Sequence, residues 1–250
     1  MLKNYSKIVF ITVGMWLNAT SCKTLYPAQE IATLLPANKS ISPDSSIKKY
    51  YQPYKDSLDK IMNAPIIELS SDLYKKQPES TLGNLMVDML KAKAEDYTKD
   101  KIDLAILNFG GIRMSSLSKG MLKVEDAYLL MPFDNYVVKQ KLTGQQVADF
   151  CDSIARMNGW PVSGISFKIK DKKAIDIKVN NVPLDYNKIY SVALIDYIAN
   201  GGDGMAFLKL IPQVQTGKLF RDAILEFWKE QAKAGKKISS TLENRISYAE

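Results

Sequence analysis

Beyond residue 63 the hydrophobic period of the sequence changes repeatedly, and this restricts the fold more than any other feature. The run KIDLAILNF (101–109) is short and apolar, as expected for a strand covered on both faces. Helical spacing of apolar residues follows Ser80 and recurs in GQQVADFCDSIARM (144–157), while GISFKIKDKKAIDIKVNNVPL (164–184) alternates as a hairpin. Because these segments alternate irregularly, we predict an α+β domain over 64–248, with a mixed sheet and packed helices.

The first 63 residues read as export and tether sequence. Two lysines precede an apolar stretch of ten residues, which is too short to span a bilayer and indicates a signal peptide over 1–21. Cys22 follows small residues and is similar in placement to the lipidated cysteine of bacterial lipoproteins; the alternative is ordinary cleavage nearby. Residues 22–63 are predicted to form a tether and a short helix after Pro53.

The absence of histidine among the 250 residues excludes several kinds of chemistry. A Ser-His-Asp or Cys-His nucleophile and any His-ligated metal centre need imidazole. The net charge of +7 comes mainly from dispersed lysines, without a basic block that interleaves aromatic residues. We therefore expect no nucleic-acid binding.

The loop ILNFGGIRMS (106–115) combines two glycines with an arginine. Glycine can adopt positive φ and lets backbone N–H groups approach a ligand closely. Arg113 is one of only four arginines among 34 basic residues, and its planar guanidinium can grip two oxygens of a phosphate or carboxylate. The alternative is a plain turn with a structural ion pair.

Two further loops also follow apolar runs and carry aromatic and polar residues. In LLMPFDNYVV (129–138), a proline fixes the backbone just before Phe133, and Asn135 offers a donor and an acceptor. In LIDYIANGGDGMAF (194–207), Tyr197 precedes Asp203, whose carboxylate can bind a vicinal diol such as ribose. The alternatives are a core phenylalanine and a solvated turn. Together the three loops could match a nucleotide part by part.

These motifs resemble a known family. NFGGIR, PFDN and DYIANGGDG, in this order and at these separations, are similar to the C-terminal domain of the 5′-nucleotidases and UDP-sugar hydrolases. STLGNLMVDML resembles the opening helix of that domain and VPLDYNKIYSVAL its late hairpin, so the likeness covers about residues 64–220. The resemblance implies substrate contacts for seven residues: Asn108, Gly111, Arg113, Phe133, Asn135, Tyr197 and Asp203.

The resemblance also implies a division of labour among these residues. Phe133 and Tyr197 would clamp the nucleobase, Asp203 would hold the ribose, and Arg113 would bind phosphate. The family usually has phenylalanine at the position of Tyr197, and Phe109 replaces a glycine. A second phosphate-binding arginine corresponds to Lys76, which offers a point charge in place of a fork.

Gly159 in MNGWPVSG corresponds to a further contact position, and no catalytic residue or metal ligand is expected in this chain. In whole enzymes of the family, a separate N-terminal metallophosphoesterase domain holds two metal ions, and we expect divalent metals only on such a partner. The expected function is therefore nucleotide binding within a split 5′-nucleotidase, by an exported chain held in the cell envelope by lipid. Lys23 after the lipidated cysteine favours the outer membrane.

Two alternatives remain. The first is a nucleoside-binding lipoprotein without enzymatic activity that works in capture or scavenging. The second is a structural scaffold with a decayed site.

Overall fold

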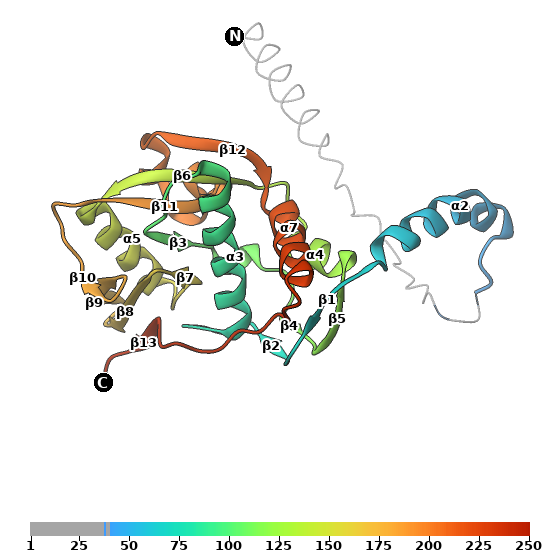
Figure 1. Cartoon of the computed structure of the whole chain (residues 1–250), viewed down its shortest axis with the longest axis horizontal. Coiled ribbons are helices and arrows are strands. Elements are labelled where there is room, and N and C mark those ends of the chain that lie inside the picture. Colours follow the sequence, from blue (N-terminus) through green and yellow to red (C-terminus); the bar gives the residue numbers. More distant parts are fainter. Residues whose placement is uncertain (1–37, 39–40) are drawn as a thin grey trace, which may run out of the picture. The chain divides into compact units, whose positions relative to one another are not determined.

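All three loops of the predicted site lie at one edge of the five-stranded sheet. The computed structural model describes residue 38 and residues 41–250, so Cys22 and the predicted signal peptide lie outside the described residues. The chain divides into two compact units, Met1–Tyr50 and Tyr51–Glu250. Within the second unit, helices and strands alternate irregularly (Figure 1), which confirms the α+β class.

The helices and strands have the following bounds. The helices are α2 (Ser45–Met62), α3 (Thr81–Thr98), α4 (Val124–Leu130), α5 (Gly144–Arg156), α6 (Asp196–Ala199) and α7 (Phe220–Lys233). The strands are β1 (Pro65–Leu69), β2 (Leu73–Tyr74), β3 (Leu104–Ile106), β4 (Ser116–Leu117), β5 (Gly120–Lys123), β6 (Tyr136–Thr143), β7 (Val162–Ser163), β8 (Ile165–Lys170), β9 (Lys173–Val179), β10 (Val182–Pro183), β11 (Ile189–Ile195), β12 (Gln213–Leu219) and β13 (Ile246–Tyr248).

Helix α2 begins eight residues before the proline that was predicted to precede it, so the prediction of a short helix after Pro53 is wrong. The side chain of Asp44 accepts hydrogen bonds from the backbone N–H groups of Ser46 and Ile47 and so caps the helix. A proline inside a helix removes one main-chain donor and crowds the preceding turn. The capped first turns form upstream of Pro53, and the helix continues through it.

The mixed five-stranded sheet has the order β12-β6-β11-β3-β7. Strand β11 is parallel to β3 and antiparallel to β6, with Ile195 opposite Val137. The carboxyl ends of β3 and β11 therefore meet at the same edge as the start of β6. The segments that follow β3, precede β6 and follow β11 are the three predicted loops, so the sheet topology brings them together.

Two long helices pack against this sheet. Helix α3 contacts β3, β6 and α7, and α5 lies between the five-stranded sheet and the β8–β9 hairpin (Figure 1). Ser80 caps α3 through a hydrogen bond from the backbone N–H of Gly83, and Thr143 caps α5 in a capping box with Gln146. Cys151 on α5 is fully buried, as expected for a small hydrophobic side chain.

The C-terminal helix α7 directly follows the edge strand β12. The segment TGKL forms the end of edge strand β12, and α7 begins at Phe220. Gly217 has a φ of +69°, and the register with β6 shifts between Gln215 and Leu219. A bulge of this kind disturbs the alternation by which a strand is recognised.

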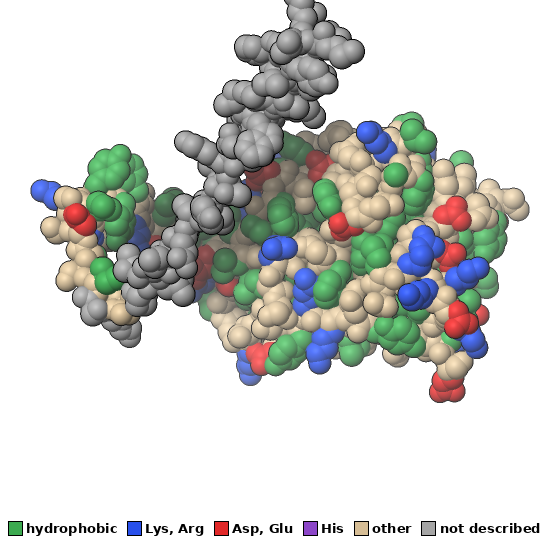
Figure 2. Space-filling model, turned by 180° about the vertical axis from the view of Figure 1, so that it is seen from behind, with side chains coloured by type: hydrophobic (Ala, Val, Ile, Leu, Met, Phe, Trp, Pro, Cys, Tyr) green, Lys and Arg blue, Asp and Glu red, His purple; other side chains and the backbone are tan. Residues whose placement is uncertain are grey.

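The surface carries both signs of charge. On the face shown in Figure 2, lysine, arginine and carboxylate side chains are interspersed with apolar ones. In the described part of the chain, every helix is too short or too polar to cross a membrane.

Candidate functional site

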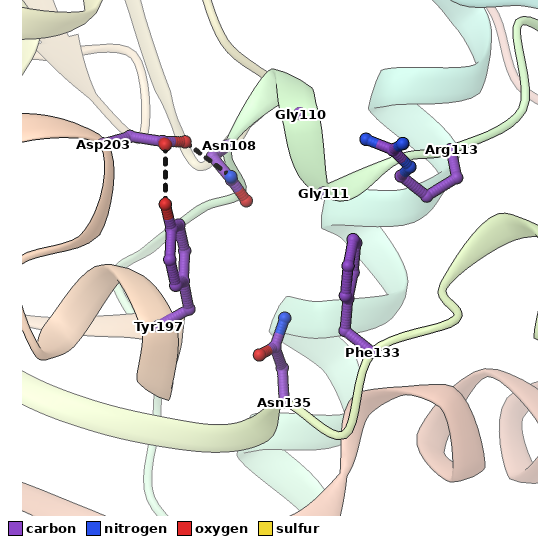
Figure 3. Close-up of a pocket in the computed structure, with 8 residues that line it drawn as sticks. All are labelled: Asn108, Gly110, Gly111, Arg113, Phe133, Asn135, Tyr197 and Asp203. Carbon is purple, nitrogen blue, oxygen red and sulfur yellow. Dashed lines mark hydrogen bonds between the residues drawn. The ribbon is translucent and has the colours of Figure 1, made fainter. Parts of the chain in front are cut away.

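Eight residues from the three loops line one pocket of about 300 Å³. This volume is at the lower end of the range of small-molecule sites, which is about 300–1,000 Å³. The structure brings together all seven residues that the resemblance singled out and adds Gly110 (Figure 3). The lining residues are Asn108, Gly110, Gly111, Arg113, Phe133, Asn135, Tyr197 and Asp203.

Two aromatic rings stand on opposite sides of the pocket, with Asn135 between them at its floor (Figure 3). Phe133 is 40% exposed and Tyr197 is 45% exposed, so the alternative of a core phenylalanine is wrong. The guanidinium carbon of Arg113 lies 5.7 Å from the centroid of the Phe133 ring, which places the arginine beside one wall. The gap between two such rings suits a flat, apolar group.

Asp203 is held by two side chains. The Tyr197 hydroxyl donates to Asp203 Oδ1 at 2.8 Å, and the Asn108 amide donates to Oδ2 at 2.6 Å (Figure 3). The hydrogen bond to the Asp203 carboxylate raises the pKa of the Tyr197 hydroxyl. Asp203 is exposed in a turn, as the alternative expected, but both of its carboxylate oxygens also accept hydrogen bonds from side chains that line the pocket.

Asp196 is a residue of the site that the sequence interpretation missed. Its Oδ1 accepts hydrogen bonds from the backbone N–H groups of Tyr197 and Tyr136, at 2.9 and 3.0 Å. The contact joins the end of β11 to the start of β6, so it fixes the spacing between the loops that carry Tyr197 and Asn135. The only signal that the sequence offers for this role is that Asp196 directly precedes Tyr197 in the motif DYIANGGDG.

Lys75 is the second missed residue, and it lies one position from the predicted Lys76. Strand β2 buries Leu73 and exposes Tyr74, so by alternation Lys75 points inward and is half-buried. Lys76 is exposed, and neither lysine is part of the pocket lining. Lys75 Nζ donates to the carbonyl oxygen of Ile112 at 2.6 Å and sits 4.0 Å from the centroid of the Phe109 ring. The Phe109 ring therefore packs against the ammonium group of Lys75.

The arginine side of the pocket is electropositive. Burial, and then the charge of Arg113, lower the pKa of the Lys75 ammonium. Among the described residues, neither Lys75 nor Arg113 forms an ion pair with a carboxylate. The alternative of a structural Arg113 ion pair is thus wrong, and the two neighbouring cations favour an anion.

The glycines serve a different purpose from the one expected. Neither Gly110 nor Gly111 has a positive φ. A Cβ at Gly111 would lie 2.6 Å from Asn108 Oδ1, so the absence of a side chain leaves room for Asn108. Gly159 lies outside the pocket lining and packs against Pro78, where an added Cβ would lie 2.5 Å from a carbonyl oxygen.

The donor set of the pocket does not fit a metal ion. The described residues contain no group of three or more Cys, Asp or Glu side chains arranged to hold one. The chemistry of the pocket is that of binding: two rings, one carboxylate, one guanidinium and two amides. These features define an α+β domain with a pocket of small-molecule size.

Comparison with known proteins places this domain in a family. Residues 60–210 match the model of the 5′-nucleotidase C-terminal domain, so the chain belongs to the family of proteins that carry this domain. Protein UshA of Escherichia coli is 36% identical over 123 residues, which are 46% of this chain and 22% of that protein. A 5′-nucleotidase of Vibrio parahaemolyticus is 27% identical over 73% of this chain and 33% of its own length.

Solved structures agree with this assignment. The 5′-nucleotidase precursor of Thermus thermophilus superimposes with a TM-score of 0.69 and 28% identity, over 83% of this chain and 44% of its own. The NAD nucleotidase of Haemophilus influenzae, at 22% identity and a TM-score of 0.58, shows the fold alone. The chain thus spans about a fifth to a third of the length of the curated relatives described above.

Proposed function

We propose that this chain is the nucleotide-binding part of a split 5′-nucleotidase and works with a separate metallophosphoesterase chain. One observation supports it above all: a single pocket gathers the rings, the carboxylate and the arginine that a nucleotide needs. The base would lie between Phe133 and Tyr197, the ribose against Asp203, and the phosphate toward Arg113. The floor amide of Asn135 would contact the edge of the base.

In this proposal the chain itself binds and orients. Divalent metals on the partner would activate water and stabilise the leaving oxygen, while this domain would hold the phosphate ester in position. The match to a C-terminal domain supports the idea that the metal-binding catalytic half is supplied by another chain. We place the pair in the cell envelope, with Cys22 as the lipid attachment point.

Calorimetry on the full chain tests the binding step. Adenosine and AMP are titrated into the wild type, Asp203→Ala and Arg113→Lys. We expect Asp203→Ala to lose both ligands and Arg113→Lys to lose AMP selectively, since a lysine cannot replace the fork. The matched control is Arg156→Lys, on the far end of α5, where the guanidinium bonds Ser153 outside this pocket. Equal loss in the control would contradict the assignment.

A reconstitution assay tests the partner. The full chain is mixed with a separately expressed metallophosphoesterase chain of the same organism and a divalent metal, and phosphate release from AMP is measured. We expect a gain in rate that Asp203→Ala removes. No gain, together with intact binding, would favour capture of nucleosides without hydrolysis, which the self-contained pocket also allows.

A further inference from the structure

Tyr197 contributes a polar group to the pocket as well as a ring. A phenylalanine at this position would give the same aromatic surface without the hydroxyl. The hydroxyl instead donates to Asp203 Oδ1 at 2.8 Å, while Asn108 donates to Oδ2 at 2.6 Å from the other side. The two donors come from different loops, one after β11 and one after β3.

The two donors leave a defined acceptor capacity on Asp203. An ionised carboxylate has about four lone-pair positions, two on each oxygen. One position on each oxygen is used by Tyr197 or Asn108, so one on each remains. Two neighbouring hydroxyl groups of a ligand need that arrangement, because each can donate to a different oxygen of the same carboxylate.

Asp203 lies in a short 3-10 turn at the surface, Gly202–Gly204. Asp203 has a φ of +50°, Gly204 follows with +80°, and both residues are exposed. Gly202 instead packs on the tyrosine, since a Cβ there would lie 2.5 Å from the ring. The Tyr197 side chain therefore packs against this loop and, together with Asn108, orients its carboxylate.

We propose that the Tyr197 hydroxyl is a positioning group that makes the pocket select ribonucleosides and ribonucleotides over their 2′-deoxy and 3′-deoxy forms. This inference rests on the proposed function, because it assigns a ribose to Asp203. With both donors in place, each oxygen of Asp203 keeps one free lone pair, and Asp203 is part of the pocket lining. A ligand that lacks one of the two neighbouring ribose hydroxyls uses only one of these lone pairs and gains less from the fixed orientation. A tyrosine hydroxyl is protonated at neutral pH, and the hydrogen bond to Asp203 raises the pKa of Tyr197 further.

Calorimetry on the full chain compares adenosine, 2′-deoxyadenosine and 3′-deoxyadenosine in the wild type and in Tyr197→Phe. We expect the substitution to weaken adenosine about tenfold, as for loss of a hydrogen bond to a charged group. The affinity for the deoxy ligands should fall much less, so the difference in affinity between adenosine and its deoxy forms becomes smaller. The matched control is Tyr186→Phe, an exposed tyrosine outside the pocket whose hydroxyl makes no hydrogen bond within the described chain.

A double-mutant cycle separates positioning from direct contact. Tyr197→Phe is repeated in the Asp203→Ala background, where millimolar dissociation constants are followed by NMR titration. We expect the effect of Tyr197→Phe to vanish there, because the hydroxyl acts through the carboxylate. An equal loss for all three ligands, or a full effect without Asp203, would overturn the inference. A wild type that binds no nucleoside would overturn the proposed function and this inference with it.

Discussion

Substitution of Gly111 by alanine tests the idea that this glycine makes room for Asn108. An added Cβ would lie 2.6 Å from Asn108 Oδ1, which is closer than side chains approach in proteins. Asn108 is only 4% exposed and cannot swing into solvent without losing its hydrogen bond to Asp203. The expected result is a displaced Asn108 and an Asp203 that is held from one side only.

The expected change in the unfolding free energy of Gly111→Ala follows from two opposing effects. Loss of a hydrogen bond to a charged group costs about 1.5–3 kcal/mol. Replacing glycine by alanine where φ is negative stabilises a protein by about 0.4–1 kcal/mol, because it reduces the conformational entropy of the unfolded chain. The net loss of unfolding free energy is therefore about 1.5 kcal/mol, which for a domain of this size lowers Tm by about 3–6 °C.

Differential scanning calorimetry of Gly111→Ala and Gly110→Ala provides the assay. At Gly110 the nearest atom to an added Cβ is Asn108 Nδ2 at 3.7 Å, an ordinary contact. The control should therefore keep or slightly raise Tm, and adenosine affinity should fall in Gly111→Ala. Equal Tm values for the two variants would refute the claim that Asn108 needs the space at Gly111.

Three further predictions concern the surroundings of the pocket. Lys75→Met removes the charge that lies over Phe109 and donates to Ile112, so AMP should lose affinity relative to adenosine in calorimetric titrations; an unchanged ratio would contradict an electropositive site. Gly202→Ala would place a Cβ 2.5 Å from the Tyr197 ring, so fluorescence titration should show loss of nucleoside binding in a chain that still folds by circular dichroism. Burial raises the pKa of the Cys151 thiol above its unfolded value, so its contribution to stability is full below about pH 9 and is lost as pH rises. In urea unfolding above that pH, the wild type should lose about 1.4 kcal/mol per pH unit more than Cys151→Ala, and parallel curves would refute this.

The gathering of these residues in one pocket was predictable because they lie in short, ordered motifs. Phe133, Asn135 and Tyr197 follow or precede apolar runs, and a mixed sheet brings such loops to one edge. Residue type and order along the chain therefore carried most of the information. Lys75 was not predictable by spacing alone, since the inward position depends on the pairing of the two-residue strands β2 and β4.

Other features depend on contacts that a linear pattern does not encode. The helix through Pro53 needs the cap by Asp44, and the end of β12 is hidden by the bulge at Gly217. The reason for Gly111 is the volume of Asn108, a residue three positions earlier that turns back on the loop. In each case, the deciding interaction joins residues whose separation in sequence gives no periodic signal.

An aspartate among glycines at the end of a buried strand now has a physical explanation. Gly201 and Gly204 adopt positive φ, which an L-residue adopts only with strain, and Gly202 lacks a side chain because the Tyr197 ring fills that space. The loop thus folds back over the tyrosine, and this return brings Asp203 to the hydroxyl six residues earlier. The conformation of the turn and the orientation of the carboxylate are therefore coupled, so a change at any of these glycines acts on Asp203.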